Sequence, residues 1–423
     1  MLLIKNGRVF GAGVADVLVR GGLIVEVSEN IHEDVGMTVI DAAGLVVAPG
    51  LVDLHVHFRD PGYEYKEDII TGSLAAAAGG VTTCCCMPNT LPVADNADVV
   101  RSIVKKAEEA VVRVLPYGAV TVGQQGRELT DFAALKAAGA VALSDDGNSI
   151  QNADLMRRAM QLACEHDMLI VSHCEDADIA QNFAVNEGAV SRQLVLPGRP
   201  AIAEEIMVAR DAMLAAETGA RLHIAHVSTA RSVEIIRKAK EAGANITAET
   251  CPQYFSLTED EVLKIGTLAR VNPPLRTSSD VEAIISGLVD GTIDAIATDH
   301  APHSADEKAL PLPEAPSGMI GLETSLALAL THLYHTGCMS IEDIITRMSI
   351  NPARIITQGD GSLVPKFNAR EPSTCANIVV FDPNEEWTVK PEEFRSKARN
   401  TPFAGMKLRG KVRYTISRGR IVP

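Results

Sequence analysis

Short apolar runs alternate with longer amphipathic stretches between residues 46 and 302. The runs are, in order, VVAPGLVDLHVH, GVTTCCCMP, VRVLPYGAV, AVALSDD, MLIVSHCE, RLHIAHVS, NITAETCP and IDAIATDHAP. Helical spacing of apolar residues between them, as in 97–110 and 153–165, indicates eight βα units. Because nearly continuous apolar runs are typical of parallel strands buried on both faces, we expect a (β/α)8 barrel over residues 46–350. An open doubly wound sheet would need a Gly-rich phosphate turn after the first run, where HVHFRDPG stands instead.

The two flanks have the pattern of short antiparallel strands. Residues 1–45 contain β-type runs at 2–4, 15–20 and 23–28, with Gly-Gly and Asn-Gly pairs that favour turns. Residues 351–423 contain three more runs, at 376–381, 411–417 and 418–421. We expect the two flanks to meet as one small β-sandwich domain beside the barrel.

Composition narrows the class of protein. Of the 423 residues, 46% are hydrophobic and 22% charged, which is typical of a globular chain, and the formal net charge is -15. Such an acidic surface repels phosphate backbones and anionic lipids, so we expect neither a nucleic acid nor a membrane partner. The eight cysteines form no spaced disulfide framework, and the N-terminus has no signal-peptide core. We therefore expect a cytoplasmic enzyme.

Histidine and aspartate side chains gather where the predicted strands end. The runs deliver, in order, His55 and His57, then Asp145 and Asp146, His173, His226, and Asp299. Active sites of (β/α)8 enzymes lie at the carboxyl ends of the strands, and a His-X-His pair in a strand places both rings on one face. Imidazole and carboxylate ligands of this kind suit zinc or a similar divalent ion.

Other polar residues have simpler interpretations. Four histidines stand away from the strand ends and are expected to be ordinary surface or core residues: His32, His166, His332 and His335. Because of its odd spacing from His226, His223 should point to the opposite face and be structural. His300 should point away from Asp299. The pattern leaves open whether Asp145 or Asp146 faces the site.

Several motifs together resemble the bacterial class I dihydroorotases of the amidohydrolase superfamily. They are HVHFRDPG (55–62), MPNT (87–90), SDDG (144–147), SHCED (172–176), AHVST (225–229), NPPLR (272–276), TDHAPH (298–303) and NTPFAG (400–405). The resemblance runs the length of the chain. It implies reversible cyclisation of N-carbamoyl-L-aspartate to L-dihydroorotate in pyrimidine synthesis, with zinc as the cofactor.

The resemblance also implies a role for each metal ligand. His55, His57 and Asp299 would hold a first zinc, and His173 and His226 a second. Many amidohydrolases bridge two metals with a carboxylated lysine, but the fourth run contains no lysine. Asp146 would be the bridge, so we expect two zinc ions, or one if this bridge leaves a site weak. Asp299 would carry the proton between water and the amide nitrogen.

Arg59 bears on substrate identity, because its planar guanidinium suits a carboxylate such as that of dihydroorotate. The alternative for Arg59 is an ion pair with Asp60 or Glu64. By resemblance, the substrate contacts are His57, Arg59, Asn89, Asn272, His303, Ser317 and Gly318. Relatives often carry an aromatic residue where Ser317 stands.

Rival functions and partners remain as alternatives. A hydantoinase or allantoinase would usually keep the bridging lysine. A non-catalytic partner of aspartate transcarbamoylase would have lost metal ligands, and every expected ligand is present here. A homodimer and a complex with aspartate transcarbamoylase are further expectations. The segment 304–317, rich in charge and proline, is expected to be a mobile loop over the site.

Overall fold

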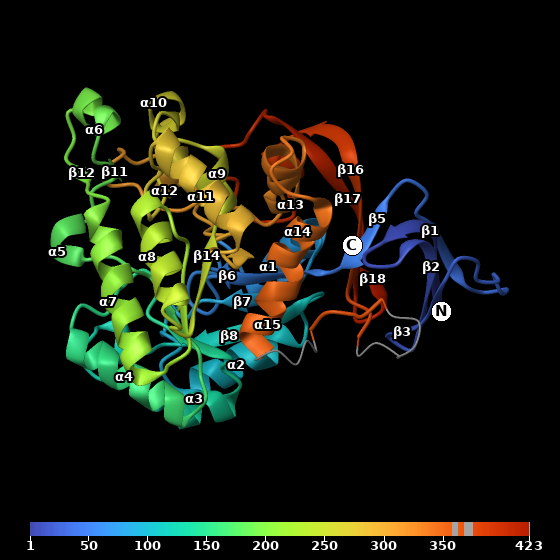
Figure 1. The fold of residues 1–423 in the computed structure, drawn as a ribbon, viewed down its shortest axis with the longest axis horizontal. Coiled ribbons are helices and arrows are strands. Elements are labelled where there is room, and N and C mark those ends of the chain that lie inside the picture. Colours follow the sequence, from blue (N-terminus) through green and yellow to red (C-terminus); the bar gives the residue numbers. More distant parts are fainter. Residues whose placement is uncertain (358–362, 368–374, 423) are drawn as a thin grey trace.

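A parallel eight-stranded barrel forms the larger part of the computed structural model, which describes residues 1–357, 363–367 and 375–422 (Figure 1). Its strands pair in chain order, from β6 (Leu51–Val56), β7 (Val81–Cys86), β8 (Arg113–Gly118) and β9 (Ala142–Ser144) to β10 (Ile170–Ser172), β13 (Leu222–Ile224), β14 (Ile246–Thr250) and β15 (Ala295–Ile296). A parallel bridge between Val56 and His300 brings the two edges together. The predicted barrel is confirmed, and all eight apolar runs supply a strand.

Helices cover the outside of the barrel, as Figure 1 shows for α4, α7, α8 and α11. The longer ones are α1 (Ile69–Ala78), α2 (Ala97–Ala107), α3 (Phe132–Ala138), α4 (Ala153–Glu165), α7 (Ile202–Thr218), α8 (Ala230–Glu241), α11 (Ser278–Asp290) and α15 (Asn351–Thr357). The Asn96 and Asn152 side chains accept backbone N–H groups at the starts of α2 and α4. These caps fix both starts at the predicted residues.

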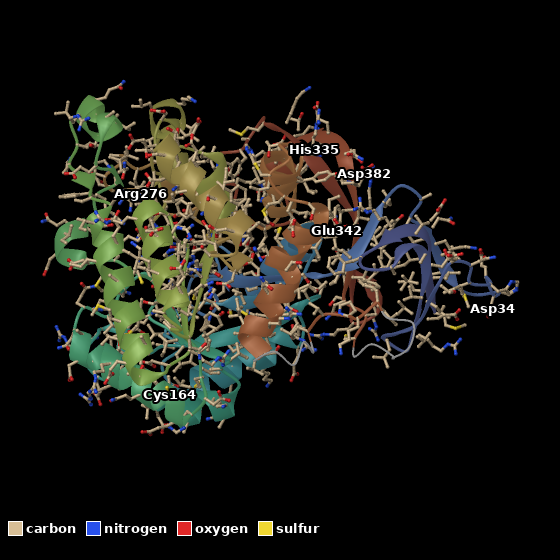
Figure 2. All side chains as sticks on the ribbon, viewed as in Figure 1. Asp34, Cys164, Arg276, His335, Glu342 and Asp382 are labelled. Carbon is tan, nitrogen blue, oxygen red and sulfur yellow. The ribbon has the colours of Figure 1, made fainter. Side chains whose placement is uncertain are left out.

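Shorter elements fill the connections. They are η1 (Val122–Gln124), α5 (Ala177–Ala180), β11 (Val185–Asn186), α6 (Ala189–Leu194), β12 (Gly198–Arg199), α9 (Pro252–Ser256), α10 (Glu261–Ile265), η2 (Gly266–Ala269), α12 (Ala305–Lys308), α13 (Ser325–Ala329), η3 (Leu330–Tyr334), α14 (Ile341–Ile345), η4 (Thr346–Ile350) and η5 (Pro391–Glu393). His335, labelled in Figure 2, follows η3 and has its Nε2 2.8 Å from the Pro383 carbonyl oxygen. This histidine therefore joins a helical segment to the small sheet, away from the strand ends.

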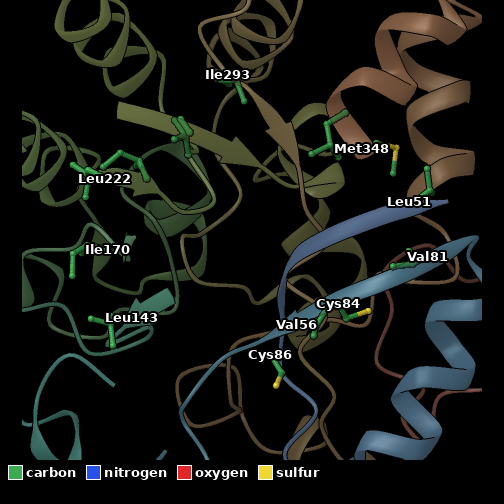
Figure 3. Close-up of a cluster of buried hydrophobic side chains, with 14 of the residues drawn as sticks. Leu51, Val56, Val81, Cys84, Cys86, Leu143, Ile170, Leu222, Ile293 and Met348 are labelled. Carbon is green, nitrogen blue, oxygen red and sulfur yellow. The ribbon is translucent and has the colours of Figure 1, made fainter. Parts of the chain in front are cut away.

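The barrel core has two apolar layers. Cys84 and Cys86 belong to a large cluster that joins strand residues to the covering helices, and Figure 3 shows both side chains on β7. Cys85 belongs to a second cluster with Tyr117 and Val171, which come from β8 and β10. Alternating side chains of β7 thus fill opposite faces of the strand. The three consecutive cysteines are buried packing residues.

The two ends of the chain form one further sheet (Figure 1). Its strands are β1 (Leu2–Val9), β2 (Gly13–Arg20), β3 (Leu23–Ser28), β4 (Thr38–Asp41), β5 (Val46–Pro49), β16 (Ile378–Thr388), β17 (Lys407–Ser417) and β18 (Arg420–Val422). β5 pairs with β16, which joins the N-terminal strands to the C-terminal ones. Apolar side chains of these strands, from both ends of the chain, form one buried cluster. The expectation that the flanks meet in one β unit is confirmed.

One turn prediction in the small sheet is wrong. Asn6 and Gly7 lie inside β1, where the register with β2 shifts, and do not connect two strands. Asn6 has φ 60°, and its backbone N–H donates to Asp16 Oδ1 at 2.8 Å. An Asn-Gly pair suits the left-handed backbone of a bulge as well as that of a turn, so its sequence signal is ambiguous.

The predicted limits of the barrel stay predictions. After residue 45, β5 still pairs within the small sheet before Gly50 leads into β6. After residue 350, α15 contributes Ala353 and Ile356 to the cluster that contains Cys85.

The loop before β4 carries Asp34, which Figure 2 labels at the end of the molecule remote from the barrel.

Candidate active site

Six side chains from five strand ends meet at the carboxyl edge of the barrel. They are His55, His57, Asp146, His173, His226 and Asp299, all of them buried. Asp299 Oδ1 lies 3.0 Å from His57 Nε2 and 3.5 Å from His55 Nε2. On the other side of the group, His173 Nδ1 lies 2.7 Å from His226 Nε2. The structure therefore brings together every residue that the sequence analysis named as a metal ligand.

Asp146 lies at the centre of this group, and Asp145 does not. Asp146 Oδ1 is 3.4 Å from His55 Nε2 and 3.6 Å from the nearest nitrogens of both His173 and His226. Asp145 instead accepts hydrogen bonds from the backbone N–H groups of Val120 and Thr121. The choice that the sequence pattern left open thus falls on Asp146 as the residue facing the group.

The cluster has the properties of a cation site. His55 Nε2 and Asp146 Oδ1 are buried, make no hydrogen bond and face each other at 3.4 Å. Unpaired buried polar atoms are costly, and one ion between them would satisfy both. Two triads bring their ligand atoms within 4.8 Å of one another, His55–His57–Asp299 and His55–Asp146–His226. Imidazole nitrogens and carboxylate oxygens at this separation suit a divalent metal ion.

Electrostatics agrees with this interpretation. Burial by itself lowers the pKa of His55, but the carboxylates of Asp146 and Asp299 outweigh it and raise that pKa well above its usual value. Burial raises the pKa of Asp146, yet the charge of His55 and the close imidazoles of His173 and His226 hold that pKa well below the usual range. The group therefore concentrates negative charge that attracts a cation.

Three residues of the site hold a left-handed backbone. Arg59, His226 and Asp299 have φ of 62°, 33° and 49°. Residues with a Cβ rarely adopt such angles, and each costs of order 1–3 kcal/mol. His226 lies two residues beyond Ile224, the last residue of β13, so regular strand alternation has ended there. The positive φ turns its side chain into the cluster, whereas His223 remains in the strand.

A cavity of about 210 Å³ opens beside the cluster. The predicted substrate contacts all line it, namely His57, Arg59, Asn89, Asn272, His303, Ser317 and Gly318. Asp299 and Asp146 line the same cavity. His303 also lines a second cavity of about 480 Å³, together with Lys66 and Lys308. The expected substrate contacts and most of the expected metal ligands thus line the same cavity.

Arg59 lines this cavity without a direct ion-pair partner among the described residues. Its Nε donates to the Pro302 carbonyl at 3.3 Å, and no carboxylate of the described residues lies within 4.0 Å of its guanidinium. Asp60, the alternative partner, pairs with Lys106 at 2.5 Å. A half-buried guanidinium without a carboxylate partner favours an anionic ligand.

Two amide side chains bind site histidines. Asn89 Oδ1 lies 2.9 Å from His57 Nδ1, so the ring N–H can donate to it and the amide N–H₂ remains for a ligand. Asn272 Nδ2 lies 3.3 Å from His173 Nε2. Arg199, at the end of β12, donates to Asn272 Oδ1 and to Glu175 Oε2. Arg199 is buried and was not singled out from the sequence, because its partner lies far along the chain.

The far wall of the cavity is a hydrogen-bonded unit. His303 Nε2 lies 2.9 Å from the Ser317 carbonyl oxygen, and the Gly318 N–H donates to the Arg270 carbonyl. A Cβ on Gly318 would come within 2.7 Å of Ala301 Cβ. Asn400, from the NTPFAG motif, donates to the Gly318 carbonyl and accepts the His303 N–H, at 3.1 Å each. The late motif therefore positions the wall without lining the smaller cavity.

Sequence reasoning missed one buried acid below the cluster. Glu249, on β14, has no accessible side chain, and its two oxygens contact His55 and His223. Burial by itself would raise the pKa of Glu249, but hydrogen bonds from His223 and His55 outweigh it and lower that pKa to about 2. The run NITAETCP contains this residue within the strand, and no spacing rule singles it out.

A buried histidine and aspartate cluster at the carboxyl edge of a (β/α)8 barrel, beside a small sheet made from both chain ends, defines a metal-dependent amidohydrolase. Comparison with known proteins narrows this class. A family model described as "Dihydro-orotase-like" matches residues 44–232. The dihydroorotase of Acetivibrio thermocellus is 48% identical, over 100% of this chain and 98% of its own. That of Ruminiclostridium cellulolyticum is 49% identical, over 99% and 97%. The chain belongs to the dihydroorotase family.

Solved structures with the same fold include hydantoinases. L-Hydantoinase from Arthrobacter aurescens has a TM-score of 0.86 and 26% identity, covering 100% of this chain and 95% of its own. Dihydropyrimidinase from Brevibacillus agri has a TM-score of 0.84 at 24% identity, over 99% and 94%, which shows the fold alone. The sequence relatives thus favour dihydroorotase over hydantoinase. In the described part of the chain, no helix is long and apolar enough to cross a membrane.

Proposed function

We propose that this chain is a zinc-dependent dihydroorotase, which interconverts N-carbamoyl-L-aspartate and L-dihydroorotate. The observation that carries the proposal is the shared cavity, where a cation-type cluster and the unpaired guanidinium of Arg59 stand side by side. A substrate that combines a ring amide with a neighbouring carboxylate needs the cluster for hydrolysis of the amide and the guanidinium for binding of the carboxylate. Simple hydantoins have the amide without the carboxylate, and relatives at 48–49% identity bear the name dihydroorotase.

The ligand set divides into two parts. His55, His57 and Asp299 would hold one zinc ion, His173 and His226 a second, with Asp146 between them. When bound, zinc acidifies water and polarises a carbonyl, which is the chemistry that ring-amide hydrolysis needs at neutral pH. Two ions are proposed, or one if the aspartate bridge leaves a site weak.

Asp299 would move the proton. In the hydrolytic direction the C–N bond of the ring breaks, water supplies oxygen to the carbonyl carbon, and the amide nitrogen gains a proton. Asp299 lines the cavity and touches the cluster through Oδ1, so it can accept the water proton and give it to the departing nitrogen. In the synthetic direction the same carboxylate carries the proton back, and water leaves.

Binding of the substrate carboxylate would use Arg59, Asn89 and His303. Burial and the neighbouring cations Arg59, Lys66 and Lys308 lower the pKa of His303 to about 2. A neutral His303 can therefore act as a hydrogen-bonding group without adding charge. Asn272, Ser317 and Gly318 would lie against the ring, and His57 would complete the contact at the metal side.

The test is an assay of the purified full chain with dihydroorotate and with an unsubstituted hydantoin, before and after metal removal by a chelator. We expect turnover of dihydroorotate, its loss with the metal and its return with added zinc. Faster turnover of the hydantoin would favour the second candidate, a hydantoinase. Absence of activity with either substrate, despite bound zinc, would favour a non-catalytic partner of aspartate transcarbamoylase. A homodimer, a complex with that enzyme and a cytoplasmic location remain part of the proposal.

A further inference from the structure

The fully buried carboxylate of Glu249 lies directly below the proposed metal site. Its Oε1 lies 2.9 Å from His55 Nδ1, and its Oε2 lies 3.1 Å from His223 Nε2. All three side chains have no exposed surface. A charge in such a place persists only with good partners, and Glu249 has a ring nitrogen for each oxygen.

His223 is itself held in one orientation. Its Nδ1 lies 2.8 Å from Thr247 Oγ1, on the neighbouring strand, and His223 and Thr247 are Cα partners in the β13–β14 ladder. A threonine hydroxyl can donate to Nδ1, which leaves the N–H on Nε2 to donate to Glu249. A chain of contacts thus runs from the ladder through His223 to the carboxylate and on to His55.

The consequence reaches the cluster through His55. If its Nδ1–H donates to Glu249, the lone pair lies on Nε2, the atom that faces Asp146 and Asp299 and has no hydrogen-bond partner. We infer that Glu249, oriented by His223, is a positioning residue that fixes the ring and tautomer of His55 for metal binding. The inference rests on the proposed metal-dependent function.

The second histidine of the pair gives a contrast within the same strand. His57 Nδ1 has the neutral oxygen of Asn89 as its partner, whereas His55 has a charged carboxylate. A carboxylate partner makes an imidazole a stronger ligand, and loss of such a partner typically weakens metal affinity by about 10–100-fold. Metal binding by His55 should therefore depend on Glu249 more strongly than metal binding by His57 depends on Asn89.

The experiment measures zinc affinity of the full chain by competition with a chelating dye. In Glu249→Gln, the neutral amide nearly preserves size, so we expect zinc affinity to fall by about 10–100-fold. Asp16→Asn is the control, since Asp16 is a buried acid of the small sheet that accepts the N–H groups of Asn6 and Ile31. It should affect thermal stability alone. Wild-type zinc affinity in Glu249→Gln would overturn the inference, whereas a wild type that binds no zinc would instead overturn the proposed function.

A second pair of variants covers the case in which Glu249→Gln does not fold. His223→Leu removes the donor to Glu249, and His223→Gln keeps an amide N–H that can reach the same oxygen. We expect weaker zinc binding in His223→Leu and recovery towards the wild-type value in His223→Gln. Equal affinity of His223→Leu and wild type would contradict a positioning role. Equal loss in both variants would contradict the hydrogen-bond argument.

Discussion

At the scale of single residues, each acid near the metal cluster has a different environment. Asp299 lines the cavity, Asp146 lies among four histidines, and Asp145 is held by backbone N–H groups. All three residues are aspartates, so the different role expected of each depends on the groups that its carboxylate contacts. Three predictions separate these roles and that of Arg59.

Asp299→Asn should reduce turnover by about 10²–10⁴-fold, the usual effect of losing a general acid–base group. The amide keeps the size of the carboxylate but cannot carry the proton. Because Asp299 Oδ1 also contacts His57, metal content has to be measured on the same sample. Wild-type kinetics with full metal content would move the proton carrier elsewhere.

Asp146→Ala should lower the number of bound metal ions, because Asp146 lies between the two groups of histidines. Asp145→Ala should leave metal content close to wild type, since its oxygens bind Val120 and Thr121. Elemental analysis of the two purified variants makes the comparison. The reverse pattern would exchange the two assignments.

Arg59→Lys keeps the charge and removes the planar fork. Loss of a charge-assisted hydrogen bond costs about 1.5–3 kcal/mol, so kcat/KM for dihydroorotate should fall roughly ten- to a hundredfold. Metal content should stay unchanged, because Arg59 contacts no member of the cluster closely. An equal kcat/KM in both proteins would contradict carboxylate recognition by this side chain.

At the scale of elements, sequence and structure agree where local pattern decides the outcome. The ends of apolar runs place His55, Asp146 and Asp299 at one edge, because parallel strands all end there. Glu249 could not be identified in this way. Its partner His55 lies 194 residues away, and neither residue interrupts the apolar run of its strand. The contact between Arg199 and Asn272, which lie 73 residues apart, is missed for the same reason, although the resemblance named Asn272 itself.

The segment from Ser304 to Ser317 is more ordered than its composition indicates. Ser304 and Glu307 cap the short helix α12, and Lys308 Nζ donates to the carbonyls of Pro316 and Gly318 at 3.0 and 3.1 Å. Its closure over bound substrate stays a prediction. Lys308 therefore ties the segment to the cavity wall, together with Arg270, which donates to the Leu312 carbonyl, and His303, which contacts the Ser317 carbonyl.

Lys308→Met should release this segment, because buried carbonyls would lose their donor at about 1–3 kcal/mol each. We expect faster proteolytic cleavage between residues 309 and 317 and a higher KM. Glu314→Gln, on the exposed side of the same segment, is the control. Dihydroorotate should slow cleavage of the wild type. Unchanged cleavage in Lys308→Met would exclude a tethering role.

At the scale of the whole molecule, the metal cluster joins strands that are far apart in the sequence. Its ligands come from β6 and from the ends of β9, β10, β13 and β15. An ion that binds them all stabilises the closed barrel relative to the unfolded chain. Affinity for metal and stability of the barrel are therefore linked.

Removal of metal by a chelator should lower the melting temperature of the barrel. Binding at a free concentration 100 times Kd contributes about 2.7 kcal/mol, which corresponds to a shift of a few degrees. Calorimetry with and without added zinc measures this shift in melting temperature. Arg59→Lys should show the same shift as wild type, and His55→Ala a smaller one. Identical melting curves with and without metal would argue against the site.

The pairing of β5 with β16 has a consequence for synthesis on the ribosome. Pro49 leaves the ribosome about 330 residues before Ile378, which at typical elongation rates is a delay of roughly 15–70 s. During that time the edge of β5 that later binds β16 has no strand beside it, and open edges invite pairing with other chains. We therefore expect the nascent N-terminal strands to be prone to pairing with other chains until the last strands emerge.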